Sequence, residues 1–316
     1  MNFWTRLQRS SIWNIALYVQ PNLDLPPAGE PRKLFLNKKL WRNPNHVHIR
    51  ADPFLYVHQG ELFLFNEAKT LNRPASIEGY KTTDLMTFTP LGVILKEPGH
   101  LSYPFVFGIG SNVFMIPESV YAREVRLYRF DDFPKRPKKV RTLLSGSYAD
   151  TSPVKVDDTW FVFTSSDRGL ELFFTDDIID GVLTIHPKSP ITVDARYRRC
   201  GGAPIKMGGR LYRLAQNCVD TYGGNLTLME IRKISRTEYE ESPAKENIFN
   251  LDQSWNREGG HHASFATFNG QTVVAVDGKE YDHFLIHKVV YCLHGLIARR
   301  SERIDASKET EGGLLS

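Results

Sequence analysis

Cysteine is scarce in this chain, as are long apolar runs and uninterrupted blocks of one charge. Its three cysteines, Cys200, Cys218 and Cys292, cannot build a disulfide framework, and no Cys-x-x-Cys spacing indicates a zinc or redox site. No stretch approaches the ~20 apolar residues of a membrane-spanning helix, and the N-terminus lacks the apolar core of a signal peptide. These absences predict a soluble, cytoplasmic protein with reduced thiols. A peripheral contact with the inner membrane stays open as an alternative.

The charge balance excludes another class of partner. A formal net charge of +4 is small for 316 residues, and the basic residues do not form one long run, so we expect no nucleic-acid partner. Glycine pairs such as Gly259-Gly260 fit no phosphate-loop pattern and precede a predicted strand. We therefore predict no cofactor. A 41% share of hydrophobic residues is enough for a substantial core in a soluble chain of this length.

One strand–turn–strand pattern recurs along the chain. In each copy, β-branched and aromatic residues flank a turn rich in Gly, Asp or Asn, which is typical of a hairpin. The copies lie near residues 54–65, 105–116, 153–163, 203–214 and 264–275. Their starts are about 50 residues apart for the first four and about 60 for the last, a period typical of propellers and solenoids.

Further apolar runs complete each copy. Third strands are predicted at 77–82, 125–130, 170–175 and 226–231, and fourth strands at 92–96, 140–144 and 191–194. Five units of four strands predict an all-β fold, a five-bladed β-propeller. A β-sandwich is the alternative, but it does not predict the similar spacing.

The predicted propeller domain spans residues 1–283. The segment 12–19 precedes the first unit and is expected to supply the outer strand of the last blade, which would close the ring. Residues 284–300 place Leu285, Val289, Leu293 and Leu296 on one face, which predicts a short C-terminal amphipathic helix packed under the propeller. A membrane-surface or partner helix is the alternative for this segment. Residues 301–316 read as a flexible tail.

Polar residues flank the predicted inner strands at equivalent places, where a propeller would bring them together. Three carboxylates on neighbouring blades are Asp52, Glu118 and Asp150. Cleaving or forming a glycosidic bond needs one carboxylic acid to protonate the leaving oxygen and a second carboxylate as base or nucleophile. We therefore assign Asp52 as base or nucleophile, Glu118 as acid and Asp150 as the group that tunes the pKa of Glu118.

Other residues of this ring have side chains that suit sugar hydroxyls or an anionic group. The predicted substrate-binding residues are Glu67, His100, Tyr103, Arg199, Gln216, His261 and His262, with Asp277 at the end of a second strand. Structural alternatives remain: Asp52 and Asp150 could cap turns, Glu118 could pair with Arg123, and Arg199 could bind Asp150. Since adjacent residues of a strand point to opposite faces, one of the two neighbouring histidines at most could normally ligate a metal, and we predict no metal site.

Several motifs, in order, resemble a known family. They are 50–54 (Arg-Ala-Asp-Pro-Phe), 100–107 (His-Leu-Ser-Tyr-Pro-Phe-Val-Phe), 115–119 (Met-Ile-Pro-Glu-Ser), 125–128 (Val-Arg-Leu-Tyr), 199–202 (Arg-Cys-Gly-Gly) and 213–218 (Arg-Leu-Ala-Gln-Asn-Cys) with Tyr222-Gly223. Over roughly residues 45–280 the chain resembles the N-terminal region of plant glucosamine inositolphosphorylceramide transferases and their bacterial relatives. That region is similar to the five-bladed propellers of arabinanase- and xylosidase-type glycoside hydrolases.

The resemblance implies roles for single residues. In those hydrolases an Asp at the start of the first blade is the base, and Asp52 in its Ala-Asp-Pro motif corresponds to it. Asp150 and Glu118 receive the other two roles from their places in the blades alone. The chain departs from the hydrolases at Ser102-Tyr103-Pro104, where they often have an acidic residue. The plant proteins also carry a separate glycosyltransferase domain, so the resemblance implies the fold and a sugar-bearing ligand rather than the transferase activity.

Together these observations predict a carbohydrate-active enzyme that hydrolyses or transfers a glycosyl unit in the synthesis of a surface polysaccharide or glycolipid. Its substrate would be a carbohydrate or glycolipid, and a transferase would also need a nucleotide-sugar or lipid-linked donor. A non-catalytic glycan-binding propeller beside a separate glycosyltransferase is one alternative. An interaction scaffold, in which the outer blade faces matter, is another.

Overall fold

The computed structural model describes residues 10–37 and 46–282, and this part of the chain is built from strands and their connections. Regular helix is limited there to a 3-10 turn at Val120–Ala122, so the prediction of an all-β fold is confirmed. Within the described residues no helix has the length and apolarity to cross a membrane. The predicted helix at 284–300 and tail at 301–316 lie outside them.

The strands group into five units of antiparallel strands, which we number along the chain. Unit 1 contains β3 (Ile49–His58), β4 (Glu61–Lys69), β5 (Ser76–Thr82) and β6 (Thr89–Leu95). Unit 2 contains β7 (Ser102–Ile109), β8 (Asn112–Glu118), β9 (Glu124–Asp132) and β10 (Lys135–Ser145). Unit 3 contains β11 (Ala149–Val156), β12 (Thr159–Ser166), β13 (Gly169–Thr175) and β14 (Thr184–Ile185).

The last two units are less regular. Unit 4 contains β15 (Arg199–Cys200) and β16 (Ile205–Met207), which both pair with β17 (Arg210–Asn217), followed by β18 (Asn225–Ile234) and β19 (Tyr239–Lys245). Unit 5 contains β20 (Ala263–Phe268), β21 (Gln271–Asp282), β1 (Ser10–Gln20) and β2 (Lys33–Phe35). A single parallel pair, Trp13↔Ile49, joins units 5 and 1 into one sheet.

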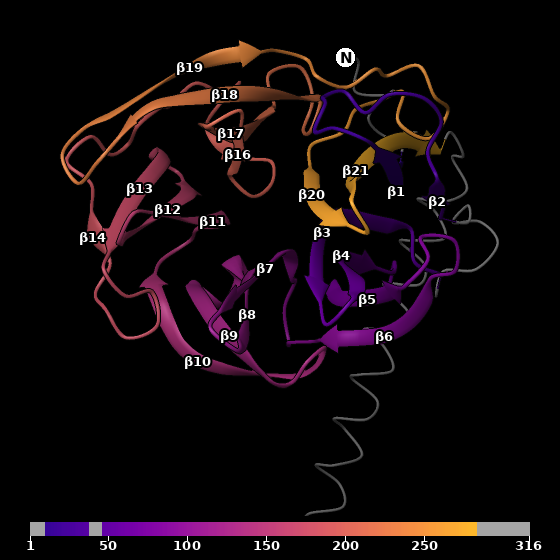
Figure 1. Ribbon diagram of the computed structural model, residues 1–316, viewed down its shortest axis with the longest axis horizontal. Helices are drawn as coiled ribbons and strands as arrows, with labels where there is room; N and C mark the ends of the chain where they lie inside the picture. The colour runs from indigo at the N-terminus through magenta and orange to yellow at the C-terminus, as the bar shows by residue number, and fades with distance from the viewer. Residues whose placement is uncertain (1–9, 38–45, 283–316) are drawn as a thin grey trace, which may run out of the picture.

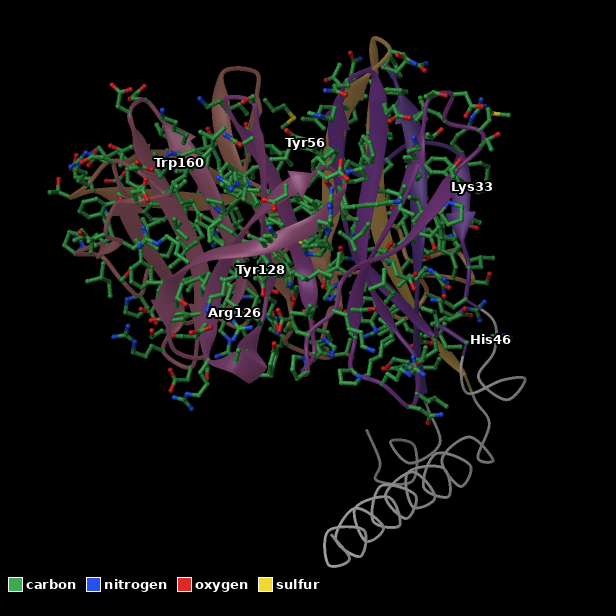
Figure 2. The ribbon with its side chains drawn as sticks, turned by 90° about the horizontal axis from the view of Figure 1, so that it is seen from below. Lys33, His46, Tyr56, Arg126, Tyr128 and Trp160 are labelled. Atoms are coloured by element: carbon green, nitrogen blue, oxygen red, sulfur yellow. The ribbon has the colours of Figure 1, made fainter. Side chains whose placement is uncertain are left out.

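Figure 1 shows the units following one another around a common centre. Strands β3, β7, β11, β16 and β20 lie nearest the middle, and β6, β10, β14 and β19 lie at the periphery. Figure 2 shows the side view, with Tyr56 and Trp160 near the turns that follow the inner strands and His46 and Arg126 toward the opposite end. The inner strands therefore begin together at one end of the molecule.

Two strand predictions differ from the structure. The segment 12–19 falls within β1, which is the third strand of unit 5 and not its outer strand, because β2 pairs outside it. Its pairing with β21 runs from Ser10↔Asp282 to Gln20↔Thr272, so the start of the chain is held along a whole strand of the last unit. In unit 3 the fourth strand is β14, whereas the predicted segment 191–194 contributes the isolated bridge Leu170↔Thr192.

Apolar side chains fill the spaces between neighbouring units. Each buried cluster joins residues of neighbouring units: Phe65 shares one with Met115 (units 1 and 2), Phe105 with Phe161 (units 2 and 3), Leu214 with Val276 (units 4 and 5), and Leu17 with Leu62 (units 5 and 1). Burying each of these large side chains contributes about 1.5–3 kcal/mol. The units therefore stabilise each other laterally and hold their inner ends in fixed positions.

The same backbone device recurs at the start of three inner strands. Asp52, Tyr103 and Asp150 have φ values of +52°, +45° and +54°, and each lies in a break of the pairing between its strand and the next. A side-chain-bearing residue in this left-handed region costs about 1–3 kcal/mol, which the surrounding contacts must offset. Such bulges re-aim a side chain, and here they turn one residue of each unit toward its neighbours.

Candidate functional site

The carboxyl group of Asp52 lies among residues of units 2 and 5. Its Oδ2 accepts a hydrogen bond from the Tyr103 backbone N–H at 3.1 Å, and its own N–H donates to Asp277 Oδ2 at 3.2 Å. His261 Nδ1 is 2.6 Å from Asp277 Oδ2, and its Nε2 is 3.7 Å from Asp52 Oδ1. Asp277 Oδ1 also accepts from the backbone N–H groups of His261 and His262. Asp277 therefore fixes an imidazole beside Asp52; we call this the Asp52 half of the site.

Asp150 is held by units 2 and 4. Arg199 Nε donates to Asp150 Oδ2 at 2.6 Å, and Arg199 Nη2 lies 3.6 Å from Glu118 Oε2. Gln216 Nε2 donates to Asp150 Oδ2 at 3.2 Å and to the Cys200 carbonyl at 2.7 Å. The Asp150 N–H donates to Glu118 Oε2 at 3.2 Å. The structural alternative for Arg199, binding to Asp150, is thus present, and the same guanidinium also faces Glu118. We call this the Asp150 half.

Glu67 and His100 form a third contact at the site. Glu67, on β4, pairs with Ala51 beside Asp52, and its Oε1 is 3.3 Å from His100 Nε2. Burial, together with repulsion from Asp52 and Glu118, raises the pKa of Glu67 well above its usual value. Burial and Lys69 lower the pKa of His100 to about 4. Both shifts act toward the uncharged forms of the two side chains, a carboxylic acid and a neutral imidazole.

The two candidate catalytic carboxyl groups are hard to ionise. Burial raises the pKa of Asp52 to about 7, with His261 acting to lower it and Asp277 and Asp150 to raise it. Burial and the Asp150 carboxylate raise the pKa of Glu118 to about 8, with Arg199 acting in the opposite direction. Near neutral pH Glu118 thus largely keeps its proton, whereas Asp52 exists in both forms.

Burial acts against both members of the Asp277–His261 pair, but their mutual attraction outweighs it. Asp277 and its hydrogen bond raise the pKa of His261, although burial alone would lower it. His261 in turn keeps the pKa of Asp277 below its usual value in spite of burial. Each partner thus favours the charged form of the other, and a protonated His261 places its positive charge beside Asp52.

The predicted substrate-binding residues divide by exposure. The side chains of His100, Arg199 and Glu118 are 42%, 25% and 15% exposed and can touch a ligand. Gln216 and His262 are fully buried. Gln216 therefore acts on a ligand through Asp150, which it holds in place.

Tyr103 is also fully buried. Its hydroxyl lies 2.7 Å from Ser152 Oγ, donates to the Gly202 carbonyl at 3.0 Å and accepts from the Gly202 N–H at 2.9 Å. The side chain that stands where the resemblance expects an acid thus links unit 2 to units 3 and 4. Its burial makes it a support of the site instead of a surface for substrate.

His262 lies next to Tyr103 in the interior of the site. Its imidazole packs edge-on against Phe54 at 4.6 Å and Tyr103 at 5.2 Å between ring centroids. Neither ring nitrogen has a hydrogen-bond partner among the described residues. Burial lowers the pKa of His262 to about 3, so the ring is neutral. The two adjacent histidines therefore differ in charge as well as in direction.

Three further residues build the site, and the sequence reasoning did not select them. Trp13 stacks on His261 at 4.3 Å, and the half-exposed Tyr222 meets the same imidazole edge-on at 5.2 Å. Lys279 is buried and donates to the Tyr222 carbonyl at 2.6 Å, which anchors this loop over the site. A Cβ at Gly223 would come within 2.8 Å of Trp13 and 2.9 Å of His261, so only glycine fits there.

Some of these residues left a signal in the sequence. Lys279 stands three positions after the apolar run 273–276 and still within β21, and a lysine inside a strand is a signal that could have singled it out. Trp13 left none, because its strand joins unit 5 only through tertiary pairing with β21.

One group of side chains in the described residues could hold a metal ion. Asp52, His261 and Asp277 each offer one ligand atom, and these atoms lie within 4.8 Å of one another. In the structure His261 and Asp277 use theirs for each other. A cation would therefore have to displace an imidazolium from its carboxylate partner.

Comparison with known proteins places this geometry in context. The family model described as glucosamine inositolphosphorylceramide transferase 1, N-terminal, matches residues 42–279. Two curated relatives carry the name glucosamine inositolphosphorylceramide transferase 1. The protein from Oryza sativa subsp. japonica is 33% identical over 296 residues, which cover 84% of this chain and 40% of the relative. The protein from Arabidopsis thaliana is 32% identical over 260 residues, which cover 76% of this chain and 34% of the relative. The chain thus spans well under half of each relative's length.

Solved structures with a similar fold act on sugars according to their titles. An α-L-arabinofuranosidase from Clostridium thermocellum has a TM-score of 0.55 at 14% identity, covering 71% of this chain and 80% of its own. A β-1,2-mannobiose phosphorylase from Listeria innocua has a TM-score of 0.55 at 12% identity, covering 84% of this chain and 96% of its own. At these identities the likeness concerns the fold alone.

The family match covers most of the described strands and all of the carboxyl groups discussed above, and the similar folds are those of family-43-type five-bladed propeller hydrolases and related enzymes. The chain therefore belongs to the family of the N-terminal domain of glucosamine inositolphosphorylceramide transferase 1.

Proposed function

We propose that residues 1–283 form a closed five-bladed β-propeller that acts on carbohydrate at its central carboxyl groups, hydrolysing or transferring a glycosyl unit. The five units of antiparallel strands, the pairing of β1 (residues 10–20) with β21 in unit 5 and the similarity to propeller hydrolases support the closed ring. The inner ends of the units then enclose the site, as in a blade arrangement around a central pocket.

The proposal depends on one observation above the others: two neighbouring carboxyl groups have raised pKa values that suit acid and base roles. Glu118, with a pKa of about 8, holds a proton at neutral pH and can donate it to a leaving oxygen. Asp52, with a pKa of about 7, is partly ionised and can serve as base or nucleophile. Enzymes that cleave glycosidic bonds use such a pair.

The other residues of the site then support these two. Asp150 raises the pKa of Glu118 and, held by Arg199 and Gln216, keeps it protonated. His261, fixed by Asp277, favours the ionised form of Asp52. The exposed part of Arg199 and the rings of His100 and Tyr222 are the groups that can contact a sugar.

The names of the relatives suggest the substrate class. By analogy with glucosamine inositolphosphorylceramide transferase 1, the acceptor would be a glycolipid and the donor a sugar derivative, used in making a surface glycolipid or polysaccharide. A cytoplasmic location, peripheral to the membrane, would bring the site to such an acceptor.

A non-catalytic glycan-binding propeller is the second candidate, and one feature favours it. Unit 2 has Tyr103 at the position that carries aspartate in units 1 and 3. The inner strand of unit 2 therefore contributes no acid at this position. In that case the site binds a glycan and a separate glycosyltransferase performs the chemistry.

Separate Asp52→Asn and Glu118→Gln variants distinguish the two candidates. Turnover of aryl glycosides and nucleotide sugars should fall by about 10²–10⁴-fold in each, because general acid–base catalysis contributes about that much. Asp158→Asn, an exposed carboxyl at the β11–β12 turn, is the matched control. The binding module would be supported instead if the unaltered protein binds glycan in calorimetry without turnover. The two variants should then bind the glycan as well as the unaltered protein does.

A further inference from the structure

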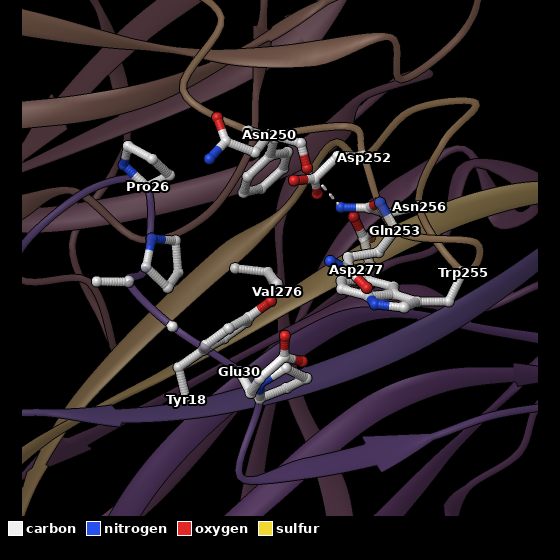
Figure 3. Close-up of a pocket in the computed structure, with 15 residues that line it drawn as sticks. Tyr18, Pro26, Glu30, Asn250, Asp252, Gln253, Trp255, Asn256, Val276 and Asp277 are labelled. Atoms are coloured by element: carbon white, nitrogen blue, oxygen red, sulfur yellow. Dashed lines mark hydrogen bonds between the residues drawn. The ribbon is translucent and has the colours of Figure 1, made fainter.

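A pocket lies against strands β1 and β21 of unit 5. The loop after β1 and the connection that precedes β20 form its walls, and its volume is about 400 Å³ (Figure 3). Its polar and aromatic lining includes Tyr18, Glu30, Asn250, Asp252, Gln253 and Trp255. Asp277 also contributes, but its carboxylate is already held by His261 and two backbone N–H groups. The volume is in the range of sites that enclose small organic ligands.

The charge of this pocket is negative and uncompensated. Glu30 and Asp252 are exposed at its rim, and neither makes an ion pair or a side-chain hydrogen bond within the described part of the chain. Both act on Tyr18: burial first, then these two carboxylates, raise the pKa of its phenol to about 12. The carboxylates thus share one field inside the pocket. A cation is the ligand that such a field attracts.

A second observation comes from Trp255, which is independent of the carboxylates. This residue is 5% exposed, and its indole Nε1 has no hydrogen-bond partner among the described residues. The ring lies close against Gly278, where a Cβ would come within 2.3 Å of its Cζ3 atom. Buried N–H groups are rarely left unpaired. An N–H needs an oxygen acceptor, which a hydroxyl group of a ligand supplies.

We propose that this pocket binds a small polyhydroxylated amine, with its ammonium group between Glu30 and Asp252 and a hydroxyl oxygen on Trp255 Nε1. The side-chain amides of Gln253 and Asn250 are placed to bind further hydroxyl groups, since each offers both donors and an acceptor. The rings of Tyr18 and Phe249 provide apolar faces for the carbon skeleton and for the cation. This site shares Asp277 with the central one, but it does not depend on the function proposed there.

A matched pair of probes tests the charge requirement. 1-Amino-1-deoxysorbitol and sorbitol differ in one ammonium group, and their binding to the full chain is measured by calorimetry at low ionic strength. The aminopolyol should bind at least 10-fold more tightly than sorbitol. In a Glu30→Gln, Asp252→Asn double variant that difference should disappear, whereas Asp158→Asn, which removes an exposed carboxyl on unit 3, should preserve it.

A Trp255→Phe variant tests the hydroxyl contact separately, because it removes the N–H and keeps a ring. We expect both polyols to bind about 10-fold more weakly, with their ratio unchanged. Since Trp255 is buried, its variant is checked by thermal unfolding, and the double variant at the exposed rim carries the test if the tryptophan variant does not fold. Equal binding of the two polyols, no saturable binding of either, or full binding of the aminopolyol to the double variant overturns the proposal. An Asp52→Asn variant should bind both probes normally. The binding test can therefore be interpreted even if the proposed catalytic role of Asp52 is wrong.

Discussion

The two halves of the central site share a left-handed backbone conformation at their aspartates but have different counter-charges. Asp52 and Asp150 both begin an inner strand in the left-handed conformation, at a break in the pairing with the next strand. Asp150 faces Arg199, whose guanidinium is always charged. Asp52 faces His261, an imidazole that carries charge because Asp277 holds it.

This difference separates a permanent charge from one that can change. A guanidinium fixes the electrostatics of the Asp150 half at every physiological pH, so Asp150 and Arg199 form a constant field for Glu118. An imidazole can lose its proton, and the charge of the Asp52 half therefore depends on pH. Breaking each half in turn should show which one shapes the pH dependence of the site and which one shapes its stability.

The largest effect is expected at Arg199. Arg199→Met leaves the buried Asp150 carboxylate without its cation, and breaking a buried ion pair costs about 3–5 kcal/mol. Because a quarter of the Arg199 side chain is exposed, we expect about 3 kcal/mol in chemical denaturation. An Asp150→Asn, Arg199→Met double variant should regain most of that stability. A double variant no more stable than Arg199→Met would show that the pair is not the source of the loss.

A smaller effect, on activity and its pH dependence, is expected at His261. His261→Asn removes the positive charge that lowers the pKa of Asp52, so that pKa should rise above about 7. Since a base must be deprotonated, the acid limb of the kcat/KM profile should move to higher pH by about one unit or more. For a rise of one unit, activity at pH 7 should fall by roughly 5-fold, because the ionised fraction of Asp52 drops from about a half to about a tenth.

His262→Asn is the control for that experiment. His262 is neutral because burial lowers its pKa to about 3, so its replacement should leave the acid limb where it is. An acid limb that moves equally in both variants would rule out the charge of His261 as the cause.

The smallest effect is expected at Tyr103, which joins the two halves across the centre. Tyr103→Phe removes the hydroxyl that accepts from the Gly202 N–H and contacts Ser152. A buried N–H left without its partner costs about 1–3 kcal/mol, and we expect about 1 kcal/mol in thermal unfolding. The control is Tyr56→Phe, whose hydroxyl makes no hydrogen bond within the described part of the chain. An equal change in both variants would mean that the link across the centre contributes nothing.

Much of the strand content was predictable because hairpins are local. The predicted third strands 77–82, 125–130, 170–175 and 226–231 fall within β5, β9, β13 and β18. The outer strands were harder to place. In unit 3 the fourth strand is the two-residue β14 and not 191–194, because an edge strand needs few apolar residues and leaves a weak pattern.

Part of the central cluster was predictable from the sequence, but the surroundings of each of its residues were not. Reading equivalent positions in each unit selected Asp52, Glu118, Asp150 and His261, which the structure places in contact or in electrostatic reach of one another. Whether a side chain faces the opening or the core depends on the neighbouring unit. Tyr103 and Gln216 were therefore selected as ligand contacts, although both are buried.

The sequence by itself determined the repeat, the strand-forming pattern and the set of polar residues that begin the inner strands, because these follow from alternation and turn residues within about a dozen positions. Tertiary structure alone decided which charge faces which carboxyl group. Asp52 and His261 are more than 200 positions apart, and Trp13 reaches them only because β1 pairs with β21. The pKa values that make the site a candidate for catalysis arise from burial and from these distant charges, and neither can be read from residues that are adjacent in the chain.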